Sequence, residues 1–305
     1  MYGPVPSRRL GRSLGVDIIP FKICSLDCIY CQLGETSQKT VERKEYSPVD
    51  DILAEIKSRI SAGLNADFIT ITGSGEPTLH SLLGRLITSI KNITDIPVAV
   101  LTNGTLFFRQ DVRADCAKAD VVLPSLDAAD EPTFKKINRP HKDISIANVI
   151  SGLSAFRNEY AGQIWLEVFL LENVNTAAVH IANLKNAIKL IRPDKVHLNT
   201  AVRPTAVPGI KKLDEKSLQT IARRLGKNCE VIADFSREHF GKHAETMTEH
   251  LLSILKRRPC SLGDISAALG ISADEALNSI DRLQHLGLVT STEKNGVTFF
   301  IANRP

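Results

Sequence analysis

Cys24-Ser25-Leu26-Asp27-Cys28-Ile29-Tyr30-Cys31 carries three thiols within eight residues, and no other two cysteines of the chain lie as close together. Thiolates with this C-x3-C-x2-C spacing can converge on one centre, and soft sulfur ligands favour zinc or an iron–sulfur cluster. A closed structural zinc site needs four ligands, and the nearest candidate for a fourth is His80. Three cysteines would leave one iron of a four-iron cluster open to an outside ligand. The motif therefore predicts an open iron–sulfur cluster, with a zinc knuckle as the alternative.

The composition indicates a soluble globular protein of 305 residues, with 43% hydrophobic and 24% charged residues. The N-terminus lacks an apolar signal-peptide core, and the apolar stretches at 98–101 and 164–171 are too short to cross a membrane. A net charge of +4 does not by itself indicate a nucleic-acid partner. Together with a thiol trio that needs reduced sulfur, these features predict a cytoplasmic protein. We expect the isolated Cys116, Cys229 and Cys260 to be small buried side chains.

Strand and helix patterns alternate along the first 240 residues. The first 15 residues are expected to form an extended arm, in which Arg8, Arg9 and Arg12 either grip a phosphate or carboxylate or are simply solvated. β-branched or apolar runs predict strands at 16–21, 68–73, 98–102, 121–123, 164–171, 195–199 and 229–233. Helical spacing predicts helices at 47–60, 79–90, 144–157 and 176–191. This βα repetition predicts a mainly parallel sheet, either doubly wound or a partial barrel.

Polar motifs follow several of these strands. They are the three cysteines, Gly75-Glu76, Asn103, Ser125 with Asp127, and Asn199 with Arg203. In both sheet architectures the ligand site lies at the carboxyl ends of the strands. We therefore expect these side chains to gather at one edge of the sheet.

The cysteine loop, with aromatic Tyr30 just before Cys31, resembles the cluster motif of the radical SAM superfamily. Gly73-Ser74-Gly75-Glu76-Pro77 resembles the glycine–glycine–glutamate–proline motif of the same superfamily, with Ser74 in place of one glycine. The resemblance implies that Cys24, Cys28 and Cys31 hold a 4Fe–4S cluster whose open iron binds S-adenosylmethionine. Gly75 allows close backbone approach, and Glu76 suits the cofactor's amino group. The alternative for this segment is a plain strand-to-helix turn with Glu76 as a first-turn acid.

Other residues are candidates for contacts with the cofactor, and each has an ordinary structural alternative. Asp127, with Ser125, can accept from a ribose hydroxyl, although Ser-x-Asp also begins helices. Asn103, followed by glycine, is equally a turn signal. Glu167 lies on an otherwise apolar strand, where a buried carboxylate needs a partner, either the cofactor or an internal ion pair. Arg203 can clamp a carboxylate or phosphate or lie at the surface. Tyr30 and Asn199 complete the predicted set.

The likeness is most particular to a group of radical SAM proteins of the Fe–S oxidoreductase type, related in motif to the wyosine-forming tRNA enzymes. It covers residues 3–234 and includes the opening Gly3-Pro-Val-Pro-Ser-Arg-Arg-Leu-Gly. The resemblance implies a partial (β/α)6 TIM-type barrel over residues 1–240. The wyosine enzymes are expected to carry extra upstream cysteines, and here no cysteine precedes Cys24, which weakens the transfer of a tRNA substrate.

Residues 241–305 follow a different pattern. Helices expected at 248–256, 261–269 and 272–286, the last opened by a Ser272–Glu275 capping box, precede a hairpin turn at Asn295-Gly296. This arrangement resembles a winged helix-turn-helix domain. Six basic and seven acidic residues lie between 245 and 305, so the surface is poorly suited to duplex DNA. Docking of a protein partner, or packing on the barrel, is the expected role.

Three functional hypotheses follow. The first is a radical SAM enzyme that cleaves S-adenosylmethionine to a 5′-deoxyadenosyl radical, with an external electron donor of the flavodoxin or ferredoxin type, and abstracts hydrogen from RNA or a small metabolite. The second is an activase that places a glycyl radical on a partner protein. The third is a zinc-stabilised helix-turn-helix regulator.

Overall fold

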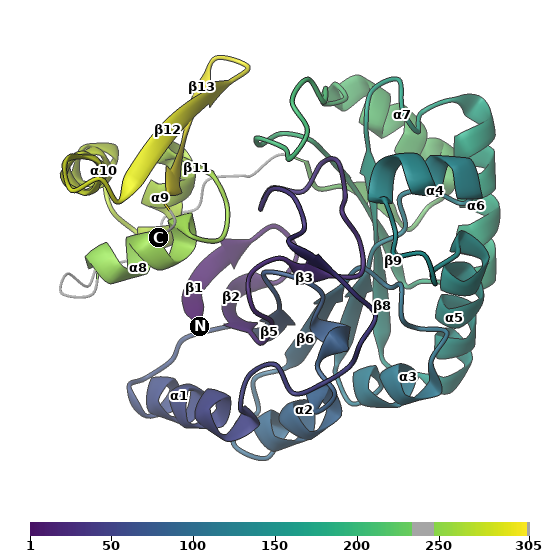
Figure 1. The fold of residues 1–305 in the computed structure, drawn as a ribbon, viewed down its shortest axis with the longest axis horizontal. Coiled ribbons are helices and arrows are strands. Elements are labelled where there is room, and N and C mark those ends of the chain that lie inside the picture. Colours follow the sequence, from purple (N-terminus) through teal and green to yellow (C-terminus); the bar gives the residue numbers. More distant parts are fainter. Residues whose placement is uncertain (234–246, 304–305) are drawn as a thin grey trace.

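The computed structural model describes residues 1–233 and 247–303 (Figure 1). Its centre is an eight-stranded sheet in the order β1-β2-β5-β6-β7-β8-β9-β10. The strands are β1 (Tyr2–Ser7), β2 (Gly11–Asp17), β5 (Phe68–Thr72), β6 (Val98–Thr102), β7 (Val121–Pro124), β8 (Gln163–Leu170), β9 (Lys195–Thr200) and β10 (Cys229–Val231). Every neighbouring pair from β2 to β10 is parallel, and only β1 runs antiparallel to its neighbour β2. The predicted mainly parallel sheet is confirmed.

Helices connect the parallel strands and cover the outer face of the sheet as an arc (Figure 1). They are α1 (Val49–Ser61), α2 (Leu83–Lys91), α3 (Gln110–Cys116), α4 (Glu131–Asn138), α5 (Ile146–Glu159), α6 (Ala178–Ile191) and α7 (Glu215–Leu225). Their apolar faces pack on the sheet, whose central strands β6, β7 and β8 are mostly apolar, as expected for strands covered on both sides. In β6, four of the five residues from Val98 to Thr102 are buried, and Leu101 is partly exposed.

The N-terminal prediction was wrong in its details. The first residues form the antiparallel β1–β2 hairpin, with Val5 opposite Ser13, and the second strand ends at Asp17 instead of extending to residue 21. Proline lacks the N–H that a central strand needs, so Pro4 and Pro6 are unfavourable inside a sheet. β1 lies at the edge of the sheet, where proline is tolerated.

Three helices that connect strands of the large sheet were not expected from periodicity, namely α3, α4 and α7. Each is at most 11 residues long. Two of them begin at aspartate caps, because the Asp130 side chain accepts from Thr133 N and that of Asp214 from Ser217 N. Short helices offer few repeats of an apolar face, so their caps were the better signal.

The C-terminal region contains α8 (Met247–Leu255), β11 (Cys260–Ser261), α9 (Leu262–Leu269), α10 (Ala273–His285), β12 (Val289–Lys294) and β13 (Val297–Ala302). The three strands form an antiparallel sheet in the order β11-β13-β12. The predicted Ser272–Glu275 capping box is present, and Asn295 and Gly296 adopt the positive φ angles of 53° and 74° that a tight hairpin turn requires. The predicted domain boundary at 240/241 lies outside the described residues.

Helices α8 and α9 lie beside β1, so the C-terminal elements pack on the edge strand of the large sheet (Figure 1). Val5 of β1 belongs to the same apolar cluster as Leu251, Leu255 and Ile265. The edge of β1 is therefore covered by helices, which protects it from pairing with another chain. Within the described residues, no helix is long and apolar enough to cross a membrane.

Candidate cluster and cofactor site

The cysteine loop follows β2 and includes β3 (Ile23–Cys24), which pairs with β4 (Gln38–Lys39). All three cysteines of the loop are free thiols. Each sulfur lies near a nitrogen donor from a different part of the chain. Lys22 Nζ lies 3.2 Å from Cys31 Sγ, Asn138 Nδ2 3.3 Å from Cys28 Sγ and Asn103 Nδ2 3.5 Å from Cys24 Sγ. Such N–H···S contacts are a common means by which proteins tune iron–sulfur clusters.

The thiols lie in an environment that disfavours their free anions. Burial, with a contribution from Glu76, raises the pKa of Cys24 to about 12. Burial and Asp127 raise the pKa of Cys28 well above its ordinary value. Ligation needs thiolates, so a cationic centre has to compensate for this cost.

The donor set fits a cluster better than a single ion. Among residues 1–233 and 247–303, no three His, Cys, Asp or Glu side chains are arranged to hold one metal ion. A zinc ion would require its sulfur ligands to meet about 2.3 Å from one point. In a four-iron cluster, each cysteine binds a different iron, so the sulfurs stay apart. The three thiols lie on one loop, and each has its own nitrogen donor. This arrangement matches a four-iron cluster, in which each cysteine binds a different iron.

Gly75 and Glu76 attach this loop to the carboxyl end of β5. A Cβ atom on Gly75 would lie 1.7 Å from the carbonyl oxygen of Ile23, so any side chain there would displace the cysteine loop. Glu76 N donates to the same carbonyl at 3.1 Å, and Lys22 N donates to Ser74 O at 2.7 Å. The close approach that Gly75 permits is thus to the chain's own backbone. Its approach to a ligand stays a prediction.

The Glu76 carboxylate is buried and accepts four hydrogen bonds. Oε1 accepts from Thr78 N at 3.0 Å, Thr78 Oγ1 at 2.6 Å and Thr102 Oγ1 at 2.6 Å, and Oε2 accepts from Asn103 N at 2.7 Å. Burial nevertheless raises the pKa of Glu76 above its ordinary value. Glu76 therefore joins the ends of β5 and β6 directly below the cysteine loop. Asn103 completes this link, since its Nδ2 also donates to Ser25 Oγ at 2.8 Å.

Asp127 is the centre of a second buried network. Tyr30 Oη donates to Asp127 Oδ2, Asn138 Nδ2 donates to the same oxygen at 2.7 Å, and Phe169 N donates to Oδ1 at 2.9 Å. The Tyr30 ring stacks on Phe169 with centroids 4.0 Å apart. Burial raises the pKa of Asp127 to about 6. The network therefore positions the cysteine loop against the ends of β7 and β8.

Four predicted residues share one small cavity. A gap of about 40 Å³ is lined by Tyr30, Asn103, Ser125 and Asp127 together with apolar neighbours. Sequence reasoning missed Asn138, which lines the same gap and contacts both Cys28 and Asp127. It lies in α4, a helix that periodicity did not predict, so no signal pointed to it. Lys22 was also missed, although its position two residues before Cys24 was a usable signal.

Glu167 forms an internal ion pair. It pairs with Arg9 from the β1–β2 turn, and Asn199 Nδ2 donates to its Oε1 at 2.9 Å. Burial disfavours this carboxylate, but Arg9 and Asn199 together hold the pKa of Glu167 below its ordinary value. Arg8 extends the network by donating to Asn199 Oδ1 at 3.3 Å. The sequence left two alternatives for Glu167, a cofactor contact or an internal ion pair, and the structure contains the ion pair. Cofactor contacts of Glu167 and Asn199 stay predictions.

Arg203 is buried, not at the surface. Its Nη2 donates to Asp264 Oδ1 of α9 at 3.0 Å, and Lys294 Nζ donates to its backbone oxygen at 2.8 Å. The guanidinium thus has a structural partner in the C-terminal region. A cofactor contact for Arg203 stays a prediction.

Comparison with protein families matches residues 18–184 to the Radical SAM superfamily. A UPF0026 protein of Methanocaldococcus jannaschii is 34% identical over 311 residues, covering 99% of this chain and 95% of that protein. A protein of Brachyspira hyodysenteriae named GTPase Obg is 37% identical over 306 residues, but this chain spans only 45% of its length. This chain therefore belongs to the radical SAM superfamily and, within it, to the UPF0026 proteins.

Solved structures agree with the fold. The structure of TYW1 with a lysine-pyruvate adduct has a TM-score of 0.55 and 18% identity, covering 73% of this chain and 75% of that one. SuiB of Streptococcus suis bound to S-adenosylmethionine also has a TM-score of 0.55, with 17% identity, covering 73% of this chain and 51% of that one. From its superfamily, the protein is an enzyme whose cofactors are a 4Fe–4S cluster and S-adenosylmethionine. Radical SAM enzymes generally need an external reductant.

Proposed function

We propose that this enzyme cleaves S-adenosylmethionine reductively at a 4Fe–4S cluster held by Cys24, Cys28 and Cys31. The observation that carries the proposal is the support of the three thiols, each beside its own nitrogen donor on a loop fixed to the end of β5. When bound, the cluster would supply one electron, drawn from an external reductant, to the sulfonium of S-adenosylmethionine, whose carbon–sulfur bond would break to give methionine and a 5′-deoxyadenosyl radical for hydrogen abstraction from the substrate.

The roles we propose for the chain's own residues follow from their positions. Lys22, Asn103 and Asn138 donate toward the sulfurs and stabilise thiolate charge. Glu76 offers a carboxylate at the end of β5 for the cofactor's amino group, next to the Gly75 turn. Asp127, oriented by Tyr30 and Asn138, offers an acceptor for a ribose hydroxyl. Ser125, Glu167, Asn199 and Arg203 complete the proposed cofactor surface.

We further propose that residues 1–240 form a partial (β/α)6 barrel and residues 241–305 a winged helix domain. Six helical crossovers between β2 and β10 support the first assignment. The helices α8, α9 and α10 with the β11-β13-β12 sheet support the second. Since α8 and α9 pack on β1, the observed contacts of this domain are with its own barrel. This favours an internal role over docking of a glycyl-radical protein.

We propose that the electron donor is a flavodoxin or ferredoxin and that the reaction takes place in the cytoplasm. The substrate is a small metabolite or an RNA. These two classes differ in size, and a cavity of about 300 Å³ lined by residues of β1, β2 and β5 favours the smaller.

Anaerobic purification followed by iron, sulfide and zinc analysis tests the proposal. We expect about four irons and four sulfides per chain and an electron paramagnetic resonance spectrum of the reduced protein that changes when S-adenosylmethionine is added. Cys24→Ser, Cys28→Ser and Cys31→Ser should each lose the cluster. Cys229→Ser is the matched control, because Cys229 is also a partly buried free thiol but lies on β10, and it should retain the iron. One tightly bound zinc without sulfide would refute the proposal in favour of the zinc-stabilised regulator.

A further inference from the structure

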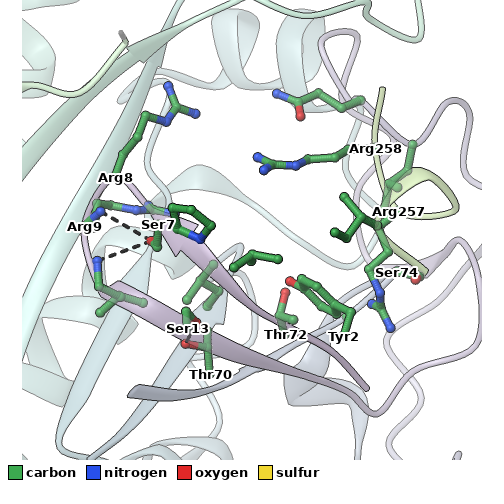
Figure 2. A pocket seen from close by; sticks show the side chains of 18 residues that line it. Tyr2, Ser7, Arg8, Arg9, Ser13, Thr70, Thr72, Ser74, Arg257 and Arg258 are labelled. Atoms are coloured by element: carbon green, nitrogen blue, oxygen red, sulfur yellow. Dashed lines mark hydrogen bonds between the residues drawn. The ribbon is translucent and has the colours of Figure 1, made fainter. Parts of the chain in front are cut away.

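A cavity of about 300 Å³ lies between the inner face of β1, β2 and β5 and the end of α8. Four arginines line it, two from each side (Figure 2). Arg8 and Arg9 come from the turn between β1 and β2, and Arg257 and Arg258 come from the segment that follows α8. Four guanidinium groups around so small a space make the cavity strongly basic, although the C-terminal region as a whole is not.

Two of these arginines already have carboxylate partners. Arg9 pairs with Glu167, and Arg257 pairs with Asp17 and lies 4.2 Å above the Tyr2 ring. Their charges are therefore largely neutralised inside the protein.

The other two arginines are less fully compensated, because Glu167 near Arg8 and Asp264 near Arg258 favour their charged forms without pairing directly with them in the described part of the chain. Within the described residues, no salt bridge connects Arg8 or Arg258 to a carboxylate. Arg8 donates to the backbone oxygens of Ile232 and Ala233 at 2.8 and 3.0 Å, and all of its hydrogen bonds in this part of the chain use Nη1. Figure 2 shows Arg8 and Arg258 on opposite sides of the cavity. Two arginines on opposite walls of one cavity can both donate to an anion held between them.

The electrostatics of Arg8 agree with this geometry, whereas Cys260 and Asp264 raise the pKa of Arg258 despite its burial. Burial and the neighbouring Arg203 lower the pKa of Arg8 to about 10. Arg8 is still charged at neutral pH, but its charge is destabilised by its surroundings. An anion bound beside it would relieve this cost, because an opposite charge favours the ionised guanidinium.

The cavity also borders the cluster loop. Gly73 and Ser74, which lead directly to Gly75 and Glu76, form part of its wall, and so do Gln32 and Leu33, which follow Cys31. Hydroxyl groups of Ser7, Ser13, Thr70 and Thr72 add further polar lining. A molecule held here would therefore lie next to the site where the radical is generated.

We propose that this cavity is the substrate site and that the substrate is a small organic anion, held through its phosphate or carboxylate group between Arg8 and Arg258. The proposal rests on the radical SAM function proposed above and specifies its substrate class. A volume of about 300 Å³ lies at the lower limit of ligand pockets. It accommodates a small metabolite, whereas an RNA strand as a whole would not fit inside it.

Calorimetric titration of the cluster-containing protein, saturated with S-adenosylmethionine, tests the assignment. The probes are pyrophosphate and citrate. We expect at least one of them to bind with a stoichiometry of one per chain, and the one that binds separates a phosphate from a carboxylate substrate. Arg8→Gln and Arg258→Gln should each weaken binding by about tenfold or more, since charge-assisted hydrogen bonds contribute about 1.5–3 kcal/mol.

Arg12→Gln is the matched control. It removes the same charge from the same hairpin, but Arg12 pairs with Asp67 and does not line the cavity. We expect less than about twofold weakening from the loss of a distant, screened charge. Circular dichroism of each variant checks folding, and the use of two variants from opposite walls guards against one that fails to fold.

The proposal is overturned if neither probe binds, or if Arg12→Gln weakens binding as much as Arg8→Gln and Arg258→Gln. It is also overturned if the anion binds only in the absence of S-adenosylmethionine, because the arginines would then hold the cofactor's carboxylate. Iron content and the response of the spectrum to S-adenosylmethionine report the proposed function separately. The same titration on cluster-free protein tests the cavity even if no cluster forms.

Discussion

The buried ion pair between Arg203 and Asp264 should be a main source of attachment of the C-terminal region to the region of the large sheet. The two side chains are only 5% and 12% exposed, and their charged atoms lie 3.0 Å apart. Arg203 Nε has no hydrogen-bond partner within the described residues, so Asp264 is the main compensation for this buried charge. Removing either partner leaves the other buried without its counter-charge, which costs about 3–5 kcal/mol.

An exposed ion pair in the same protein provides the comparison. Arg85 and Asp50 lie closer together, at 2.7 Å, but their side chains are 54% and 77% exposed. Solvent screens such pairs, and they contribute about 0–1 kcal/mol. If burial and not distance determines the contribution of an ion pair to stability, the buried Arg203–Asp264 pair should stabilise the fold more than the shorter, exposed Arg85–Asp50 pair.

Urea unfolding followed by circular dichroism measures the difference. We expect Arg203→Met and Asp264→Asn each to lower the free energy of unfolding by about 3 kcal/mol or more, and Arg85→Met by less than about 1 kcal/mol. Asparagine at 264 retains an oxygen for the Ser261 cap, so its effect reports mainly the lost charge. The double variant should be less destabilised than the sum of the single variants by at least about 1 kcal/mol. Strict additivity, or equal losses at the buried and exposed pairs, would refute the reasoning.

Three further predictions concern the site. Lys22→Met removes a positive charge 3.2 Å from Cys31 Sγ. The midpoint potential of the cluster should fall, by roughly 60 mV if that charge contributes about 1.4 kcal/mol. An unchanged midpoint in a potentiometric titration would contradict this prediction. Burial raises the pKa of Asp127 from 3.8 to about 6, so its protonated form stabilises the cluster-free folded chain fully below about pH 4, and about 3 kcal/mol is lost as the pH rises through 6. Urea unfolding at pH 4 and pH 8 should show this loss in the wild type and not in Asp127→Asn, and parallel behaviour of the two proteins would exclude it. Gly75→Ala places a Cβ 1.7 Å from Ile23 O and should displace the cysteine loop, with iron content falling well below that of the wild type after anaerobic reconstitution; full iron loading would show that the loop tolerates the change.

Features that depend on neighbours in sequence could be predicted from the sequence. The three cysteines lie on one short loop, the Ser272–Glu275 box caps its own helix, and Asn295-Gly296 forms its own turn. The parallel sheet was also predictable, because βα alternation leaves few other solutions. The β1–β2 hairpin was not, since its prolines are acceptable only at an edge that the rest of the sheet defines.

The sequence by itself determined the chemistry of this protein, because a cluster motif is local and its spacing is visible in one stretch of chain. Only the tertiary structure determined what surrounds that motif. Tyr30 meets Asp127 across 97 residues, Arg203 meets Asp264 across 61, and Arg257 meets Asp17 across 240. The arginine cavity likewise combines the two ends of the described chain. Such contacts arise because parallel strands and packed helices bring distant segments of the chain together. The pattern of residues along the chain does not show which distant residues become partners.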